Sequence, residues 1–362
     1  MPLTDHQLQL FKELTELRGV SGQEKEINAY LTKKYEELGL EIVRDNLGSL
    51  FAYKPSKKPN AKKVMIAGHM DEVGLIVVKI NPNSLLKADP VGGLNSETLL
   101  AHRIHVQTTS GTWLPGAIDA IPPHLQTAAD RDSVTPIKNM LFDFGFRSEE
   151  EARLAGIKEG SQIVVDGEFV SLNNGQRILG KAFDNRYGLV LGLDLLEHLQ
   201  DVELDVDLYV GGTVQEEVGL RGAETASYLI DPDLAIVLDC SPARDSSGDT
   251  SQLGQLGDGV LIRYFDRGMI AFKELLDYQM EAADKTGVKY QYFDSPGGTD
   301  AGAIHKKYSG IRTLTHCIVA RNIHTCSSVI DIDDYIAARE TLIYMIENLD
   351  DERFESWAKA RR

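Results

Sequence analysis

Apolar residues recur along this chain with two different periods, and each period predicts a kind of secondary structure. Over residues 6–17 they fall mostly on one helical face, which predicts an amphipathic helix. The stretch 21–24, SGQE, has the form of a capping box and predicts the start of a second helix. Residues 41–44 and 49–53 are expected to pair as a hairpin, and the apolar run 63–67 is typical of a buried parallel strand.

The second half of the chain alternates strands with helices. We expect strands over 205–214, 234–238, 260–265, 289–293 and 313–319, and helices over 185–199, 223–229, 271–285, 300–307 and 333–349. Such alternation predicts a mostly parallel sheet with helices on both faces. The predicted fold class is therefore α/β, arranged as an α/β/α sandwich.

The middle of the chain has a different pattern. Between Val73 and about Val165, strand-like pieces recur with Gly and Pro between them, and the helical period fades. We interpret residues 73–165 as a β-rich domain inserted into an α/β domain formed by residues 1–72 and 166–362. The alternative is that this stretch is the middle of one mixed domain. A chain of 362 residues is long for a single core, which favours two domains.

Composition and charge exclude several classes of protein. The formal net charge of −17 argues against binding to nucleic acid or to anionic membrane surfaces. The N-terminal segment lacks the features of a signal peptide, and no apolar run reaches the roughly 20 residues of a membrane span. The three cysteines, Cys240, Cys317 and Cys326, have no paired spacing and predict free thiols. We therefore expect a soluble cytoplasmic protein.

Two adjacent carboxylates, Glu216 and Glu217, follow the predicted strand 205–214 and precede a glycine-containing turn. Neighbouring carboxylates at the end of a buried strand repel each other unless positive charge lies beside them. One could bind a metal ion while the other acts as a base on metal-bound water. For an isolated Glu-Glu pair, two solvated loop charges would be the ordinary interpretation.

Further residues of metal-ligating type stand near other predicted strand ends and at one helix start, namely His69, Asp71, Asp184, Asp239 and His324. The carboxyl ends of parallel strands face one crevice, so these side chains can converge although they are far apart in sequence. Imidazole and carboxylate together suit zinc and related divalent ions. With Glu216 and Glu217 the set is too large for one tetrahedral site and suits two metals about 3.5–4 Å apart. Asp71 could be a ligand, or the acceptor that fixes the ring of His69.

Six stretches of the chain carry a resemblance to a known family. They are AGHMDEVG (67–74), KAFDNRYG (181–188), VQEEVGLRGA (214–223), LDCSP (238–242), GGTDAG (297–302) and RNIH (321–324). Together they closely resemble the M42 family of co-catalytic metallo-aminopeptidases, especially its glutamyl aminopeptidase branch, over nearly the whole chain. The family usually has an aromatic residue where this chain has Asn322, so we expect a local packing change there and no loss of a ligand.

The resemblance implies a site for two divalent ions per subunit, zinc or cobalt. Asp184 would bridge both ions. His69 and Asp239 would complete one site, and Glu217 and His324 would complete the other.

The resemblance also implies the catalytic groups and the architecture. Glu216 would be the general base that activates a metal-bridging water, and Asp71 would be the partner of His69. The implied fold is a zinc-exopeptidase-like catalytic domain with an inserted β-barrel-like domain used in dimerisation. Family members commonly build dodecamers, so we expect self-association through residues 73–165. The substrates would be peptides with a free N-terminus.

The glutamyl branch implies a preference for N-terminal Glu or Asp, which requires a cation. Arg263, inside an apolar strand, is the candidate because a guanidinium binds a carboxylate bidentately. Alternatively, Arg263 pairs with a structural carboxylate, and the cation is Arg221, Arg267 or Lys273. Other functions left open are a broad or leucyl-type aminopeptidase, a metal-dependent N-acyl deacylase, an endoglucanase with two carboxylates and a non-catalytic binding protein.

Overall fold

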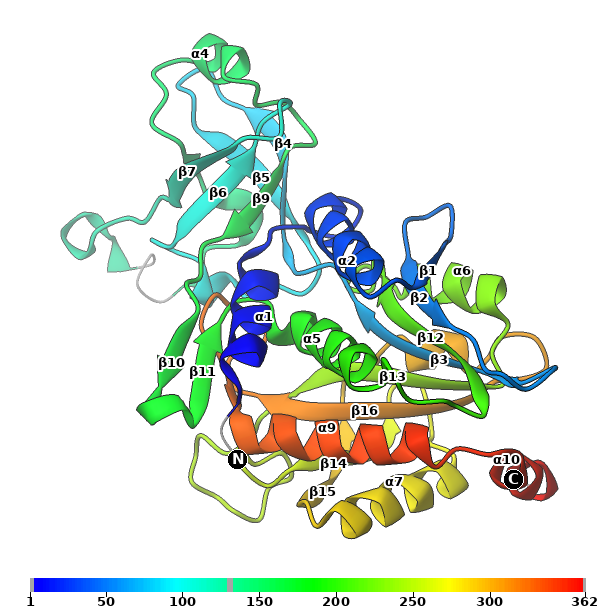
Figure 1. The fold of residues 1–362 in the computed structure, drawn as a ribbon. Helices are drawn as coiled ribbons and strands as arrows, with labels where there is room; N and C mark the ends of the chain where they lie inside the picture. The colour runs from blue at the N-terminus through cyan, green and yellow to red at the C-terminus, as the bar shows by residue number, and fades with distance from the viewer. Residues whose placement is uncertain (1–2, 129–132, 361–362) are drawn as a thin grey trace.

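An α/β sandwich carries a small β-barrel on one side (Figure 1). The computed structural model describes residues 3–128 and 133–360. The sandwich is built on an eight-stranded sheet. In spatial order its strands are β1 (Glu41–Arg44), β2 (Leu50–Lys54), β12 (Val206–Thr213), β3 (Lys62–His69), β13 (Leu234–Pro242), β16 (Arg312–Ala320), β14 (Val260–Asp266) and β15 (Tyr290–Ser295).

Four neighbouring strands at the centre of this sheet run parallel. β12 pairs with β3, β3 with β13, and β13 with β16. Only towards the edges does the direction change, because β2 is antiparallel to β12 and β14 is antiparallel to β16. The expected α/β sheet is therefore confirmed, and the carboxyl ends of its four central strands share one edge.

Both faces of the sheet are buried, which explains the continuous apolar runs of its central strands. In β3, Val64 and Ile66 belong to a large core, while Met65 and Ala67 belong to a separate cluster. The large core also contains side chains of α1 (Asp5–Glu16), α2 (Lys25–Glu37), α5 (Phe183–His198), α7 (Lys273–Thr286), α9 (Ile332–Glu347) and α10 (Asp351–Lys359). Helices α6 (Arg221–Ile230) and α8 (Ala301–Ile304) contribute to the separate cluster.

The barrel is formed between β3 and α5 in the chain. Its six strands close in the order β4 (Gly74–Ile80), β5 (Leu86–Val91), β8 (Phe142–Asp143), β7 (Trp113–Ile118), β6 (Arg103–Gln107) and β9 (Gln162–Val165). A core of its own, including Leu75, Ile104, Val106, Phe142 and Ile163, fills the barrel. These strands lie within the segment 73–165 that we interpret as an insertion. The short helix α4 (Glu149–Leu154), capped by Ser148, lies in the same segment.

The structure also contains a three-stranded sheet that the sequence did not suggest. It pairs β10 (Val170–Leu172) with β11 (Arg177–Gly180), and β11 with β17 (Ser328–Asp331). β17 therefore joins the segment just after the barrel to the segment just after β16. The loop between β16 and β17 carries His324.

The predicted capping box at residues 21–24 is wrong. Helix α2 begins at Lys25, and its N-cap residue Glu24 makes no capping hydrogen bond with its side chain. The hydroxyl of Ser21 instead donates to Asp71 Oδ2 at 2.6 Å. A capping box does open α1, where Thr4 and Gln7 bond reciprocally. Ser21 therefore holds the side chain of Asp71 in place instead of capping a helix.

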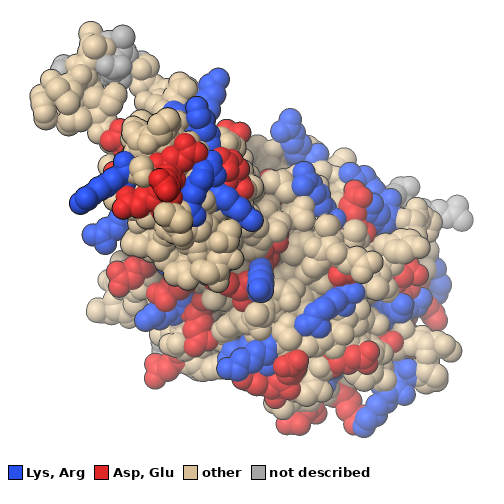
Figure 2. All heavy atoms as spheres, turned by 90° about the horizontal axis from the view of Figure 1, so that it is seen from above, with Lys and Arg blue, Asp and Glu red and all other residues tan. Residues whose placement is uncertain are grey.

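Charged side chains of both signs are mixed over the surface seen from above the barrel, whereas a lobe projecting beside it is mostly uncharged in this view (Figure 2). The connection between β7 and β8 carries exposed apolar residues, including Ile121, Leu125 and Val134. Within the described residues, no helix has the length and apolar character needed to span a membrane.

Candidate metal centre

The residues singled out by sequence converge at the shared edge of the parallel strands. His69 ends β3, Asp239 lies in β13, and Glu216 and Glu217 follow β12. Parallel pairing sets Thr213 of β12 beside His69 of β3, so the next residues of both strands emerge together. Asp184 and His324 reach the same point from the start of α5 and from the β16–β17 loop.

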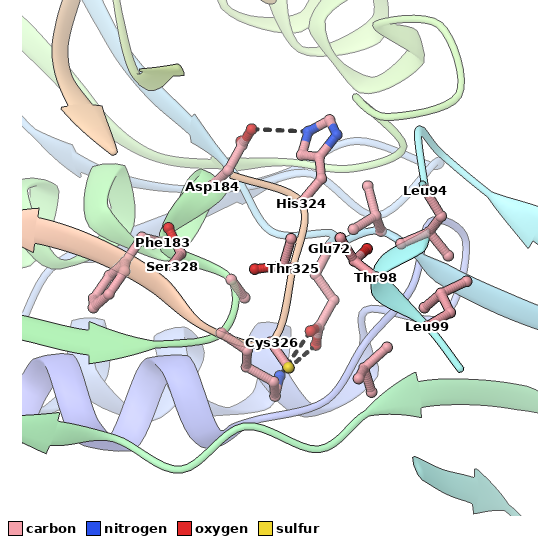
Figure 3. Close-up of a pocket in the computed structure, with 14 residues that line it drawn as sticks. Glu72, Leu94, Thr98, Leu99, Phe183, Asp184, His324, Thr325, Cys326 and Ser328 are labelled. Carbon is pink, nitrogen blue, oxygen red and sulfur yellow. Dashed lines mark hydrogen bonds and ion pairs between the residues drawn. The ribbon is translucent and has the colours of Figure 1, made fainter. Parts of the chain in front are cut away.

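Asp184 lies between two imidazoles. Its Oδ1 is 2.8 Å from Nε2 of His69, and its Oδ2 is 3.1 Å from Nε2 of His324. Figure 3 shows the Asp184 and His324 side chains pointing toward one another. A carboxylate that presents one oxygen to each of two histidines has the arrangement that a bridging ligand requires.

The backbone around Asp184 is tied to the sheet. The peptide bond between Asp184 and Asn185 is cis, and Ala182 adopts a left-handed φ of 56°. The amide of Asn185 donates to the carbonyl of Leu238 in β13 at 2.6 Å, and its oxygen accepts from Gly188 N at 3.0 Å. The carboxylate of Asp184 is therefore held in place by contacts of the residue next to it in the first turn of α5.

Backbone carbonyls orient both histidine rings. Nδ1 of His69 lies 3.0 Å from the carbonyl oxygen of Asp71, and Nδ1 of His324 lies 2.9 Å from that of Gly93. A carbonyl only accepts, so each Nδ1 must carry the proton it donates. Each Nε2 is then the nitrogen that faces Asp184 and is available to a metal.

Asp71 lies behind the Glu-Glu pair. Its Oδ1 accepts from Glu216 N at 3.0 Å, and its Oδ2 accepts from Glu217 N at 3.1 Å and from the Ser21 hydroxyl. The side chain is fully buried, and its Oδ1 is 3.5 Å from Nδ1 of His69. Asp71 thus orients the backbone of both glutamates, a contact that the sequence did not suggest.

The site carries more negative than positive charge. Burial raises the pKa of Glu216, Glu217 and Asp239, and neighbouring carboxylates add to the effect. Burial would lower the pKa of His324, yet Asp184 and Glu217 raise it to about 11. Burial likewise opposes ionisation of Asp184, but hydrogen bonds with His324 and His69 lower its pKa. Because carboxylates outnumber the histidines here, the site favours binding of a cation.

The donor set fits two divalent ions. His69, Asp184 and Asp239 form one group whose ligand atoms lie within 4.8 Å of each other, which we call the His69 group. Asp184, Glu217 and His324 form a second, the His324 group, and the two groups share Asp184. Glu217 Oε1 is buried without a hydrogen-bond partner among the described residues, although it lies 3.3 Å from Nε2 of His324. A cation would satisfy this oxygen and take the place of a proton on Nε2 of each ring.

A network of buried charged residues lies beside the candidate site. Lys181 Nζ donates to both carboxylate oxygens of Glu72, at 2.8 and 2.7 Å, and to the carbonyl of Leu17 at 2.7 Å. The guanidinium of Arg186 lies 3.4 Å from Glu72 and donates to Leu14 O at 3.1 Å. This network joins the end of α1 and the start of α5 to the residue that precedes the barrel.

Asp300 is a second buried carboxylate near the site. Its Oδ2 accepts from the hydroxyl of Thr213, whose oxygen also lies 3.2 Å from the carbonyl oxygen of Gly68. Burial raises the pKa of Asp300 to about 6, and its Oδ1 has no hydrogen-bond partner within the described part of the chain. The sequence patterns did not predict a role for Glu72, Lys181, Arg186 or Asp300. The available signal was their position inside stretches that carry the family resemblance.

Arg263 is buried beside the site, with 2% of its surface exposed. Its Nε donates to Asp266 at 3.0 Å, its Nη1 to Ser241 at 3.0 Å, and its Nη2 to Gly297 O at 2.8 Å. Arg263 therefore pairs with a structural carboxylate, that of Asp266, as the alternative interpretation of the sequence predicts. Arg263 is nevertheless close enough for its charge to lower the pKa of Asp239, against the dominant effect of burial.

Two groups of histidine and carboxylate that share one aspartate lie at the carboxyl edge of a parallel sheet, and such groups could hold the metal of a metal-dependent hydrolase. The family model described as M42 glutamyl aminopeptidase matches residues 48–341, and a model described as AMPT matches residues 5–28. The chain belongs to the M42 family. It is a metallo-aminopeptidase, as the sequence resemblance predicts.

Two curated relatives match over almost their full length. The glutamyl aminopeptidase of Lactococcus lactis subsp. cremoris is 39% identical over 94% of this chain and 96% of the relative. The lysyl aminopeptidase of Pyrococcus furiosus is 30% identical over 94% of this chain and 98% of the relative.

Two solved structures show the same architecture. The TET aminopeptidase from the marine sediment archaeon Thaumarchaeota archaeon SCGC AB-539-E09 has a TM-score of 0.92 at 34% identity, covering 98% of this chain and 99% of that one. The TET1 peptidase of Pyrococcus horikoshii, which can assemble into a tetrahedron or a large octahedral shell, has a TM-score of 0.85 at 28% identity. It covers 95% of this chain and 100% of the other.

Asp184→Asn should remove most of the chain's capacity for divalent ions, because one neutral amide would then fail both groups. Equilibrium dialysis against Zn²⁺, with metal counted per chain, measures this. The matched control is Asp194→Asn on the same helix, a buried carboxylate bound to Gln7, Tyr335 and Arg339 instead of the site. Wild-type metal content in Asp184→Asn would exclude Asp184 as the shared ligand.

Proposed function

We propose that this enzyme removes the N-terminal residue of peptides with the help of two divalent ions, zinc or cobalt. His69, Asp184 and Asp239 would hold one ion, and Asp184, Glu217 and His324 the other. The observation that carries the proposal is the pair of distances from the two oxygens of Asp184 to two different histidines, 2.8 and 3.1 Å. When bound, such a pair of ions lowers the pKa of water and polarises the scissile carbonyl.

Glu216 would move the proton. Its Oε2 lies 4.0 Å from Nε2 of His69, and its backbone N–H is fixed by Asp71. Burial and neighbouring carboxylates raise the pKa of Glu216, which favours a side chain that carries a proton during the reaction. Glu216 would take the proton of the attacking water and return it to the leaving amine. Glu217, by contrast, would bind a metal ion and take no part in proton transfer.

The excess of carboxylates also supports an exopeptidase. A peptide's free α-amino group, cationic in solution, would bind one of the ions or an acidic group beside them. An N-acylated peptide lacks this charge and would bind poorly. A metal-dependent deacylase would show the opposite preference, so blocked and free substrates distinguish the two reactions.

Glu216→Gln should keep metal binding close to that of the wild type while kcat falls by about 10²–10⁴-fold, since only the proton transfer is removed. Peptidase assays and metal content on the same preparations measure both effects. Glu217→Gln is the paired comparison, and it should lose metal as well as activity. If Glu216→Gln turned over substrate at a near-normal rate, another group would have to be the base.

For specificity we propose a preference for N-terminal Glu or Asp. The support is the name of the 39% identical relative, a glutamyl aminopeptidase, and the buried cation Arg263 near Asp239. A lysyl aminopeptidase matches at 30% identity, so membership of the family leaves this preference open. Arg263 has five N–H donors, and its contacts with Asp266, Ser241 and Gly297 leave one on Nη1 for a substrate.

Anilides of Glu, Asp, Lys and Leu should be hydrolysed with the highest kcat/KM for the acidic residues, and N-acetyl-Glu anilide should resist cleavage. Arg263→Lys keeps the charge but loses the guanidinium's fork, so it should reduce kcat/KM for the Glu anilide more than for the Leu anilide. An equal reduction for both substrates would assign Arg263 a structural role only. A preference for leucine would exclude the acidic specificity.

We also propose that the chain self-associates through its inserted barrel and builds a dodecamer. The exposed apolar side chains of Ile121, Leu125 and Val134 are suited to burial against another copy. The related TET1 peptidase, which can assemble into a tetrahedron or a large octahedral shell, supports the same idea. Light scattering should give a mass near twelve times the 40.0 kDa of one chain. A monomeric mass at micromolar concentration would contradict the proposal.

A further inference from the structure

The two candidate metal-binding groups are supported by different parts of the protein. The ring of His69 is fixed by the carbonyl of Asp71, which follows β3 within the α/β sandwich. The ring of His324 is fixed by the carbonyl of Gly93, which lies after β5 in the inserted barrel, at 2.9 Å. One group is therefore oriented by the sandwich alone, while the other takes its orientation across the boundary between the two parts.

The turn Gly92–Gly93 fits closely against this second group. A Cβ at Gly92 would meet Val73 at 2.8 Å and Cβ of Glu217 at 3.1 Å, and Gly92 has a φ of +84° that favours glycine. A Cβ at Gly93 would lie 3.3 Å from Nδ1 and 3.5 Å from Cε1 of His324. A side chain at Gly92 would therefore crowd Glu217, and one at Gly93 would crowd His324, the two residues of the His324 group that are not shared.

The turn is also attached to the barrel on both sides. Val91 ends β5 and pairs with Gly74 at the start of β4. Leu94 packs against the barrel's own core, and Leu94 and Leu99 line the pocket beside Asp184 and His324 (Figure 3). Any shift of the barrel relative to the sandwich would therefore move the Gly93 carbonyl relative to the ring of His324.

We propose that Gly92–Gly93 is a positioning element for the second metal, so that the His324 group binds its ion with full affinity only while the barrel is seated on the sandwich. The inference rests on the proposed two-ion site. It adds that the two ions depend unequally on the inserted domain. Partners that orient a ligating histidine change metal affinity by about 10–100-fold when they are lost.

Gly93→Ala is the direct test, because Gly93 is not among the residues with positive φ and its new methyl would meet only the ring of His324. Calorimetric titration with Zn²⁺ and visible absorption with Co²⁺ report the two ions separately. The wild type should bind two ions. Gly93→Ala should bind one of them with wild-type affinity and the other about 10–100-fold more weakly.

The control for a general effect on the barrel is Gly111→Ala, in the β6–β7 hairpin. Gly111 has a φ of +86°, and a methyl group placed there would have no described atom within 4 Å, so this variant strains the barrel far from the site. It should keep both ions. Adding Gly93→Ala to His324→Ala should change nothing further, because the ring that the methyl meets is gone. This double variant also separates an effect on the ring from misfolding.

Two results would overturn the inference. One is wild-type affinity for both ions in Gly93→Ala, and the other is an equal loss in Gly93→Ala and Gly111→Ala. A wild-type protein that binds fewer than two ions would instead refute the proposed function itself, before any variant is compared.

Discussion

Buried negative charge at one edge of a parallel sheet is the constraint around which the structure is organised. Asp184, Glu216, Glu217 and Asp239 meet near the ends of the central strands, and the imidazoles of two histidines face them. Ionised carboxylates this close and this buried destabilise one another unless cations lie between them. Burial raises the pKa of Glu216, Glu217 and Asp239, so either bound protons or cations can relieve this repulsion.

The surrounding residues hold this arrangement through paired contacts. Asp71 receives two backbone N–H groups and one hydroxyl. Glu72 is matched by Lys181 and Arg186 in a buried network. Removing one member of such a network leaves an unpaired buried charge, which costs far more than a surface ion pair. Asp71 thus fixes the backbone of Glu216 and Glu217 through its own buried carboxylate.

The inserted barrel belongs to the site as well as to the surface. Its β5 leads directly to the Gly93 carbonyl that orients His324, while the rest of the barrel has an independent core. A domain with its own core can move as a body, and here such a movement would change the contact between Gly93 and the ring of His324. Arg263, beside the site, is likewise held by several partners, because it donates to Asp266, Ser241 and Gly297.

The sequence by itself determined the class of fold, most of the strands and helices, and which residues of metal-ligating type gather at the site. Apolar runs such as Val64–Ile66 and carboxylates directly after a strand are local features, and parallel strands bring their ends together whatever connects them. The family motifs added the pairing of residues into two groups, which spacing alone could not supply. The insertion was visible because the period of the pattern changed at Val73.

Only the tertiary structure decided how those residues are held. Ser21 fits a helix-cap pattern and instead bonds Asp71, because a hydroxyl serves whichever partner the fold brings near. The roles of Asp300, Lys181 and Gly93 depend on neighbours more than 80 residues away, and no local pattern encodes such contacts. The orientation of a carbonyl toward an imidazole is a property of packed backbone, which leaves no trace in residue type except a glycine.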